Sequence, residues 1–245
     1  MALLELDRVE KRFRGLVAVK GVTFEVDEGA IVALVGPNGA GKTTLLKAIG
    51  GMHAPTAGRI AFAGRDVGRS APHRSRHAGI AMVMQTPRPF ETLTVLENAV
   101  VGAMFGGEKA SEREATARAH EMLAFVGLDN RAHDEVGALN LHQLRFLEIA
   151  RQLASRPRLV LLDEVMAGLN DTEIATSIAM VRRIRAEWGV TVIWVEHVMK
   201  AVISLAERVL VLNFGRLIAD GAPAAVMTEP AVVEAYLGDR GLGTA

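Results

Sequence analysis

The sequence predicts an α/β fold in which a mixed β-sheet is combined with an inserted helical segment. Three observations lead to this prediction. Short apolar runs alternate with helical patterns, the runs near the N-terminus alternate apolar and polar residues instead, and residues 92–156 hold no comparable strand. The chain has 245 residues, half of them hydrophobic, which is enough for a sizeable core, so we expect one domain over residues 1–245.

The first strands are expected at residues 3–9 and 22–26, where apolar and polar residues alternate. This alternation is typical of half-buried antiparallel strands near the edge of a sheet. Nearly continuous runs of Val, Ile and Leu predict further strands that are covered on both faces. These runs are residues 31–35, 80–84, 159–162, 190–195 and 209–212.

Helices are predicted between these runs. Ser111 and Glu114 have the spacing of a capping box, apolar residues follow on one face, and Gly127 ends a helix over residues 112–126. This helix lies in the segment 92–156, which we interpret as a helical subdomain inserted into the domain. A second helix is expected to begin at Asn170 or Asp171 and to end before Gly189.

The composition excludes several classes of protein. Lys and Arg number 28, as do Asp and Glu, and neither end carries a block of one charge, so nothing favours autonomous binding of nucleic acid. Because no Cys occurs, disulfides and thiolate metal sites are excluded. The longest apolar runs are far below the ~20 residues that a transmembrane helix needs, and the N-terminus does not resemble a secretory signal.

A glycine-rich segment follows the predicted strand at 31–35 and precedes a helical run at 45–49. This context and spacing fit a phosphate loop, in which glycines let backbone N–H groups point at a phosphate. Lys42 can reach the β- and γ-phosphates, and the Thr43 hydroxyl can bind Mg²⁺. A bare glycine-rich turn is the weaker interpretation, so we predict a P-loop NTPase core. The candidate nucleotide-binding residues in it are Gly36, Asn38, Gly39, Ala40, Gly41, Lys42, Thr43 and Thr44.

Two carboxylates, Asp163 and Glu164, end the apolar run at 159–162. At a strand end beside a phosphate loop, Asp163 is suited to holding Mg²⁺ and Glu164 to polarising an attacking water. The alternative is a helix cap beyond a core strand. A GTPase is a weaker choice than an ATPase, because a long helical segment separates the two motifs and no Asn-Lys-x-Asp guanine-reading motif occurs.

Further segments stand in a fixed order around these two motifs. They are Phe13 within residues 9–13, Gln85 within residues 84–86, residues 139–143 before a helical run, residues 167–170, and His197 within residues 195–197. With them, essentially the whole chain resembles the ATP-binding subunit of an ABC transporter. Seen singly, Phe13 would be read as a core aromatic, Gln85 as a surface residue at a strand end and His197 as a structural histidine. Their joint order favours the resemblance.

The resemblance implies a role for each of these residues. Phe13 would stack on adenine, Gln85 would touch Mg²⁺ and link the core to the helical subdomain, and His197 would contact the γ-phosphate. Asn140, Leu141, His142 and Gln143 would face the ATP of an opposite subunit, so that two subunits enclose two ATP molecules. The catalytic candidates are thus Glu164 and His197, and the metal candidates are Thr43, Gln85 and Asp163.

One departure from the family pattern lies in residues 139–143. The family has a serine and a glycine where this chain has Asn140 and His142. Asn140 can still donate a hydrogen bond, and the backbone N–H of His142 remains. We hypothesise that the shared site works with an altered closure or pH response, because His142 can titrate near the triphosphate. The alternative is a neutral variation.

The resemblance also implies partners: transmembrane permease subunits, a second ATP-binding subunit that is either a copy or a paralogue, and, indirectly, a solute-binding protein. Phe90, in a predicted loop after Gln85, is interpreted as an anchor for a permease helix rather than as a core residue of the helical subdomain. The subunit would be peripheral, at the cytoplasmic face of the inner (plasma) membrane.

A finer resemblance, to ATPases of branched-chain amino acid importers, rests on four segments: residues 13–19, 93–98, 167–170 and 229–238. The alternative is a soluble ABC ATPase that acts on ribosomes or nucleic acid. Such proteins usually carry two fused ATP domains, a coiled coil or a basic arm, which this sequence lacks. His73 and His77 are read as a solvated helix face, and Trp188 and Trp194 as packing residues.

Overall fold

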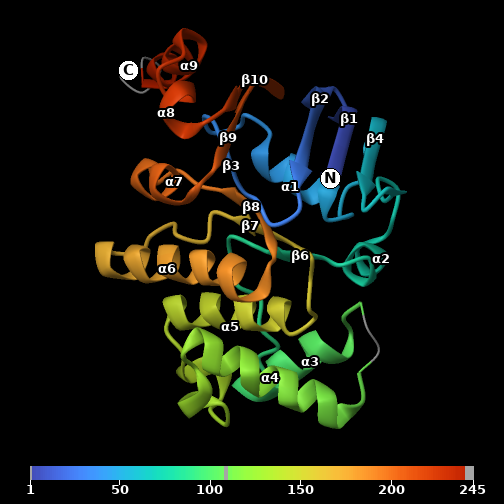
Figure 1. The fold of residues 1–245 in the computed structure, drawn as a ribbon, viewed down its shortest axis with the longest axis vertical. Coiled ribbons are helices and arrows are strands. Elements are labelled where there is room, and N and C mark those ends of the chain that lie inside the picture. Colours follow the sequence, from blue (N-terminus) through green and yellow to red (C-terminus); the bar gives the residue numbers. More distant parts are fainter. Residues whose placement is uncertain (1, 108–109, 241–245) are drawn as a thin grey trace.

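The computed structural model describes residues 2–107 and 110–240, which form two β-sheets with helices around them (Figure 1). The first sheet has four strands in the order β2-β1-β4-β5, and all its neighbours are antiparallel. Its strands are β1 (Ala2–Phe13), β2 (Leu16–Asp27), β4 (Ala57–Phe62) and β5 (Arg65–Asp66).

The predicted N-terminal strands lie within β1 and β2 and pair antiparallel, with Val9 opposite Val22. Both strands are longer than predicted, because register shifts after Val9 and Lys11 interrupt the alternation on which the prediction was based. These strands also form a sheet of their own with β4 and β5, instead of extending the sheet that carries the apolar runs.

The second sheet has six strands in the order β10-β9-β3-β8-β7-β6, and it is mixed, because β10 runs antiparallel to β9 while the other neighbours are parallel. All five apolar runs of the sequence are strands in this sheet. The strands are β3 (Ile31–Val35), β6 (Ile80–Val83), β7 (Leu159–Asp163), β8 (Thr191–Val195), β9 (Arg208–Asn213) and β10 (Arg216–Gly221).

Two predicted helices begin with capping boxes, as the spacing of Ser111 and Glu114 predicts for the first of them. Ser111 and Glu114 form a capping box at the start of one, Asn170 and Glu173 form one at the start of the other, and Gly127 takes the left-handed conformation that ends the first. The helices are α1 (Lys42–Ile49), α2 (Pro72–His77), α3 (Val95–Met104), α4 (Glu112–Val126), α5 (Leu141–Leu153), α6 (Asp171–Trp188), α7 (Met199–Leu205), α8 (Pro223–Val226) and α9 (Pro230–Arg240), with short 3₁₀ turns at Asp129–Arg131 and Val136–Ala138.

Buried apolar residues tie these layers together. Helix α1 packs between the four-stranded sheet and one face of the six-stranded sheet. On the other face, Trp194 is fully buried in a cluster that includes α3 to α7, and Trp188 packs edge-to-face on Phe125, so both tryptophans are packing residues as predicted. No helix in residues 2–107 and 110–240 is long and apolar enough to cross a membrane.

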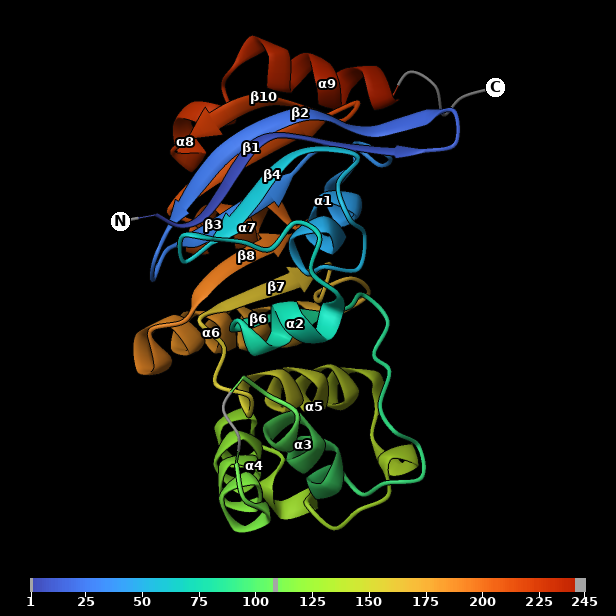
Figure 2. The same ribbon diagram turned by 90° about the vertical axis from the view of Figure 1, so that its right-hand side faces the viewer.

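Helices α3, α4 and α5 lie together at one end of the molecule (Figures 1 and 2). Arg76 of α2 enters this group: its guanidinium bonds to the side chain of Gln152 and donates to the carbonyl oxygen of Gly102 at 3.1 Å. Burial lowers the pKa of Arg76 to about 10. Helices α3 and α5 are so close that a Cβ atom on Gly102 would lie 2.0 Å from the carbonyl oxygen of Arg151.

Candidate active site

The glycine-rich segment forms a tight loop between β3 and α1. Gly36 has φ 144° and Gly41 has φ 104°, in the region that favours glycine. A Cβ on Gly36 would lie 2.0 Å from the carbonyl oxygen of Leu212, and one on Gly41 would lie 2.4 Å from that of Ala18. Both glycines are therefore required by the close approach of neighbouring backbone, and the loop opens onto the N-terminus of α1 as a phosphate site requires.

Lys42 is buried, and its ammonium group is held by the loop itself. Its Nζ donates to the carbonyl oxygens of Gly36 at 2.7 Å and Pro37 at 2.9 Å. These acceptors are neutral, and hydrogen bonds to an anion are stronger than bonds to a neutral acceptor. A phosphate oxygen in the loop would therefore compete well for this ammonium group.

A surface hollow lies in front of the loop and brings many of the predicted nucleotide residues together. Phe13 stands at the end of β1, 39% exposed, with the Nζ of Lys11 5.0 Å from its ring centre and His53 packed edge-on at 5.2 Å. Glu164 and the exposed Phe214 complete the lining. The other residues around the hollow are Leu16, Val17, Ala18, Lys20, Asn38, Gly39, Ala40, Gly41, Lys42, Thr43 and Thr44.

Asp163, at the end of β7, meets the first turn of α1. The Thr43 hydroxyl donates to its Oδ1 at 3.0 Å. Burial raises the pKa of Asp163, while the Thr43 hydrogen bond lowers it by a smaller amount. A hydroxyl and a carboxylate at this separation supply the oxygen donors that Mg²⁺ prefers, and a cation would favour the ionised carboxylate.

Glu164 joins three segments of the site. Its backbone has φ 51°, and its N–H donates to the carbonyl oxygen of Val195 at 3.0 Å. Its two carboxylate oxygens contact different partners: Oε2 accepts from the side-chain nitrogen of Gln85 at 2.7 Å, and Oε1 lies 2.6 Å from Nε2 of His197. Three predicted residues from distant parts of the chain are thus brought into direct contact.

Residues 140–143 lie at the N-terminus of α5 and do not line this hollow. Asn140 caps the helix by accepting from the backbone N–H of Gln143 at 2.9 Å, and Gln143 accepts from the N–H of Asn140 at 3.0 Å. The His142 ring packs on Phe146 with 4.2 Å between ring centres, and its Nε2 is buried with no hydrogen-bond partner among the described residues. Burial lowers the pKa of His142.

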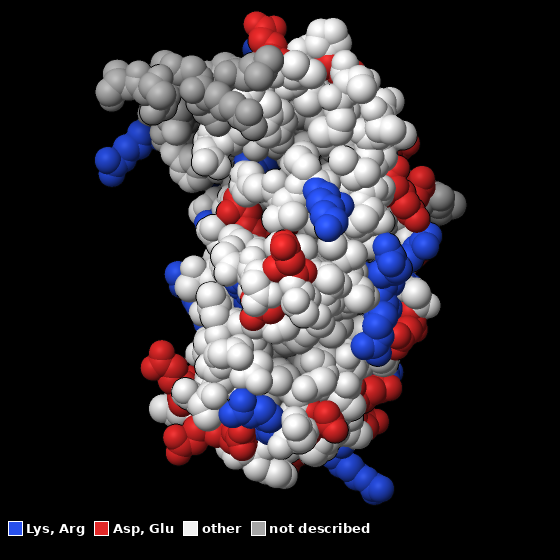
Figure 3. Space-filling view, turned by 90° about the vertical axis from the view of Figure 1, so that its left-hand side faces the viewer, with Lys and Arg blue, Asp and Glu red and all other residues white. Residues whose placement is uncertain are grey.

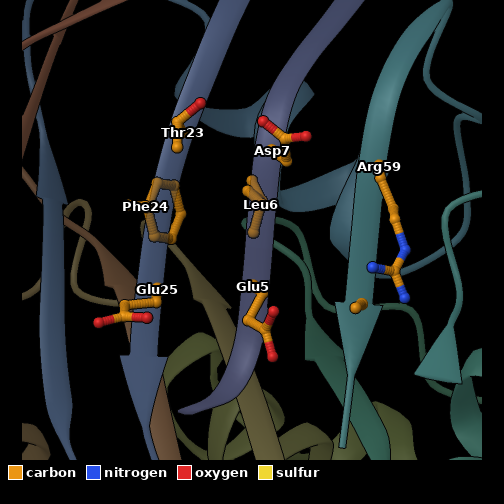
Figure 4. Close-up of a pocket in the computed structure, with 8 residues that line it drawn as sticks. Glu5, Leu6, Asp7, Thr23, Phe24, Glu25 and Arg59 are labelled. Atoms are coloured by element: carbon orange, nitrogen blue, oxygen red, sulfur yellow. The ribbon is translucent and has the colours of Figure 1, made fainter. Parts of the chain in front are cut away.

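A second hollow lies on the outer face of the four-stranded sheet, where the side chains of Glu5, Asp7, Glu25 and Arg59 stand on neighbouring strands (Figure 4). Three carboxylates against one guanidinium make this hollow unsuited to a triphosphate.

His73 and His77 meet edge-on, with Nδ1 of His77 2.6 Å from the carbonyl oxygen of His73. Across residues 2–107 and 110–240, no cluster of three His, Asp or Glu side chains is arranged to hold a metal.

Sequence reasoning missed three residues near the site. Phe214 lines the hollow from the turn between β9 and β10, and nothing in its sequence context predicts this position. Glu196 and Arg145 contact the segment that follows Glu164. An acidic residue directly after a buried strand was the available signal for Glu196.

The fold and the phosphate loop define an ATP-binding cassette. The sequence pattern of the ABC transporter family matches residues 19–167, and the chain belongs to this family, whose ATP-binding subunits are ATPases. The pattern described as branched-chain amino acid ATP-binding cassette transporter matches residues 216–241. Within the family, the chain thus groups with ATP-binding proteins of branched-chain amino acid transport, as the sequence predicts.

Individual relatives are similar over nearly their whole length. The chain is 37% identical to the high-affinity branched-chain amino acid transport ATP-binding protein BraF of Pseudomonas aeruginosa, covering 97% of this chain and 98% of that protein. It is 33% identical to LivG of Escherichia coli K12, with the same coverage. A solved ATP-binding cassette in its ADP conformation has a TM-score of 0.88 and 30% identity, covering 97% of this chain and 99% of that one. These likenesses confirm the predicted fold class.

A dimeric cassette with ADP and phosphate bound is also similar, with a TM-score of 0.81 and 25% identity, covering 90% of this chain and 98% of that chain.

Proposed function

We propose that this protein binds and hydrolyses ATP, together with Mg²⁺, between two facing ATP-binding subunits, and so powers the import of branched-chain amino acids or related polar solutes. The observation that carries the proposal is the contact of Glu164 with both Gln85 and His197 at the edge of the phosphate-loop hollow. The relatives named for branched-chain amino acid transport support the choice of solute.

ATP would lie along the hollow, with its base on the open face of Phe13 and its phosphates in the loop. The backbone N–H groups of residues 36–44 would hold the phosphates, and Lys42 would leave the carbonyl oxygens of Gly36 and Pro37 for phosphate oxygens. This assignment fits the charge of the hollow, since its lining contains Lys20 and Lys42 and the single carboxylate of Glu164.

The residues beside the loop fit Mg²⁺. Thr43 and Asp163 already place two oxygen atoms 3.0 Å apart, and the amide of Gln85 is linked to the same region through Glu164. Bound there, Mg²⁺ would neutralise charge on the transferred phosphoryl group. Burial and, to a smaller extent, the charge of Glu164 raise the pKa of Asp163, and a bound cation would oppose both effects.

Glu164 would polarise the attacking water, and His197 would contact the γ-phosphate. The 2.6 Å contact between His197 and Glu164, which follow the neighbouring strands β8 and β7, orients both side chains. Gln85 holds the second carboxylate oxygen, so the amide must release Glu164 or move with it when the site binds its ligands. Gln85 begins the segment that leads to α3. A change in its hydrogen bond to Glu164 when nucleotide binds can therefore shift the position of α3 to α5 relative to the site.

The second half of the nucleotide site would come from an opposite subunit, either a copy or a paralogue. Residues 140–143 do not line the hollow of their own chain, and they lie at a helix N-terminus where backbone N–H groups can meet an anion. We place the γ-phosphate of the opposite subunit's ATP there. We also propose that residues 1–245 form a single ABC ATPase domain in which residues 92–156 are the helical subdomain.

The permease subunits would bind near Phe90, with a solute-binding protein acting through them and not on this chain. Phe90 is 48% exposed, and its backbone is fixed by the Asn98 side chain, which accepts from its N–H at 2.8 Å and donates to its carbonyl oxygen at 3.1 Å. The Arg151 guanidinium lies 5.3 Å from the ring centre. A rigidly held, exposed aromatic suits an anchor for a permease helix, which would place the protein peripherally at the cytoplasmic face of the plasma membrane.

The relatives favour this function over that of a soluble ATPase acting on ribosomes or nucleic acid. The distribution of charge agrees, since Lys and Arg are interspersed with Asp and Glu on the face drawn in Figure 3.

Substitution of the water-polarising carboxylate tests the proposal. We expect Glu164→Gln to lower kcat for ATP hydrolysis by about 10²- to 10⁴-fold, the usual contribution of a general base, while the variant still binds ATP and accumulates as a dimer. Phosphate release and sedimentation velocity with MgATP measure the two effects. Glu187→Gln is the control, because Glu187 forms an exposed ion pair with Arg183 on α6. Undiminished hydrolysis by Glu164→Gln would contradict the assigned role.

A further inference from the structure

A buried carboxylate that does not line the nucleotide hollow lies directly after β8. Glu196 is 1% exposed. Its Oε1 accepts from the backbone N–H of Met166 at 2.8 Å, and its Oε2 accepts from the backbone N–H of His197 at 3.2 Å. The two oxygens thus bind two different segments of the chain, one that follows Glu164 and one that begins at the histidine.

The surroundings of Glu196 match an ionised carboxylate, which can only accept hydrogen bonds. Burial raises the pKa of Glu196, and the hydrogen bonds from the N–H groups of Met166 and His197 lower it by a smaller amount. A buried carboxylate is costly, and an apolar side chain of similar size is often at least as stable in such a place. The contacts that Glu196 makes therefore call for a reason other than packing.

These contacts link the two backbone segments that carry Glu164 and His197. The carboxylate of Glu164 and the imidazole of His197 meet at 2.6 Å on the side of the hollow. Behind them, the backbone N–H of Ala167 donates to the carbonyl oxygen of Glu164 at 3.2 Å, which closes residues 164–167 into a tight turn. Glu196 holds the Met166 N–H inside this turn, so one side chain fixes both backbone segments from which the catalytic side chains project.

Arg145 of α5 holds the same turn from the other side. Its Nη2 donates to the carbonyl oxygen of Ala167 at 2.6 Å. Burial lowers the pKa of Arg145, and the charge of Glu196 offsets part of this effect. The peptide groups of Met166 and Ala167 are therefore bonded to a carboxylate at one end and to a guanidinium at the other. Arg145 lies near the start of α5, so its hydrogen bond to Ala167 also connects the N-terminal part of α5 to residues 164–167.

We propose that Glu196 is a positioning residue for ATP hydrolysis. It fixes the position of Glu164 relative to His197 by accepting hydrogen bonds from the backbone of the segment after Glu164 and from the backbone of His197. It does not line the hollow, so it acts on the rate of the reaction and not on the binding of ATP. The proposal rests on the proposed function, in that Glu164 and His197 are taken as the catalytic pair.

The test is the isosteric variant Glu196→Gln, in which one of the two acceptor oxygens becomes a donor that faces an N–H group. We expect kcat to fall by about 10- to 100-fold, as when a group that orients a catalytic residue is removed, with the KM for ATP within about twofold of wild type. Glu196→Asp keeps the charge but is one methylene too short to span both N–H groups, and we expect an intermediate kcat. Glu187→Gln again serves as the control.

Binding of the two backbone segments is measured separately by the amide proton resonances of Met166 and His197 in the full chain. Both should lie at low field in the wild type and move upfield in whichever of the two variants folds. Wild-type kcat in the folded variants, a loss of ATP affinity that accounts for the fall in rate, or unmoved amide resonances would each overturn the proposal. A wild-type protein that fails to hydrolyse ATP would refute the proposed function instead, and the resonances would still decide whether Glu196 joins the two segments.

Discussion

Replacing Gly102 of α3 by alanine sets two effects against each other. Alanine in a helix interior is more favourable than glycine by about 1 kcal/mol, which predicts a more stable protein. The added Cβ, however, would lie 2.0 Å from the carbonyl oxygen and 2.8 Å from the carbonyl carbon of Arg151, both of which are backbone atoms of α5. Such a contact cannot be relieved by rotating a side chain, so α3 must move away from α5.

We take the cost of this overpacking at the upper end of the usual range, about 3 kcal/mol, because Arg76 also donates to the carbonyl oxygens of Gly102 and Arg151 and its hydrogen bonds would be stretched. The net loss is then about 2 kcal/mol, which for a chain of this length lowers Tm by about 4–8 °C. The measurement is thermal unfolding followed by circular dichroism in the absence of nucleotide.

Gly137→Ala is the matched control, since a Cβ at Gly137 meets nothing within 4 Å and its φ is not positive. This variant should be neutral or slightly more stable, by up to about 1 kcal/mol. A Tm for Gly102→Ala at or above that of the wild type would refute the reasoning, because helix propensity would then outweigh the contact with α5.

Two further predictions concern the nucleotide site. Phe13→Ala should raise the KM for ATP by about 10- to 100-fold, with kcat at saturation within about twofold, since stacking on a base contributes about 1–3 kcal/mol. Steady-state kinetics measure both constants. A fall in kcat without a change in KM would exclude stacking on Phe13. The pKa of His142 is lowered, because burial and Arg145 outweigh the opposite effect of Glu173. His142 is therefore neutral at pH 7. The folded protein loses stability as the pH falls below about 6.5, the pKa of histidine in the unfolded chain, because the buried imidazole resists protonation. The ATPase and stability profiles of wild type and His142→Gly should therefore diverge below that pH, with the larger loss in the wild type, and superimposable profiles would remove the proposed role of the imidazole.

The apolar runs predicted the parallel strands well because burial on both faces leaves a strong signal in the sequence. Strands β4, β5 and β10 were not predicted, since none of them is a continuous buried apolar run: half of β4 and all of β5 are exposed, and β10 has exposed charged residues near both ends. The separation into two sheets was equally out of reach. It depends on α1 packing between them, and no local pattern encodes that contact.

The placement of the candidate site was predictable where a residue type and its spacing form a known pattern, as in residues 36–44 and at Asp163. The contacts that organise it were not. The bond from Glu196 to Met166 spans 30 residues and the bond from Arg145 to Ala167 spans 22, and in both cases the partner is a backbone atom, which has no residue type to recognise. The buried environment of His142 likewise depends on how α5 packs and not on the residues beside it in sequence.

Phe13 and the phosphate loop belong to different sheets, and this has a consequence for engineering. The aromatic ring stands at the tip of the β1–β2 hairpin, whereas the loop follows β3. In the proposed binding mode, the nucleobase thus meets a hairpin whose tip is solvent-exposed, apart from the residues proposed to act on the phosphates. Substitutions in residues 13–16 should therefore change the affinity for nucleotide and leave the phosphate loop intact.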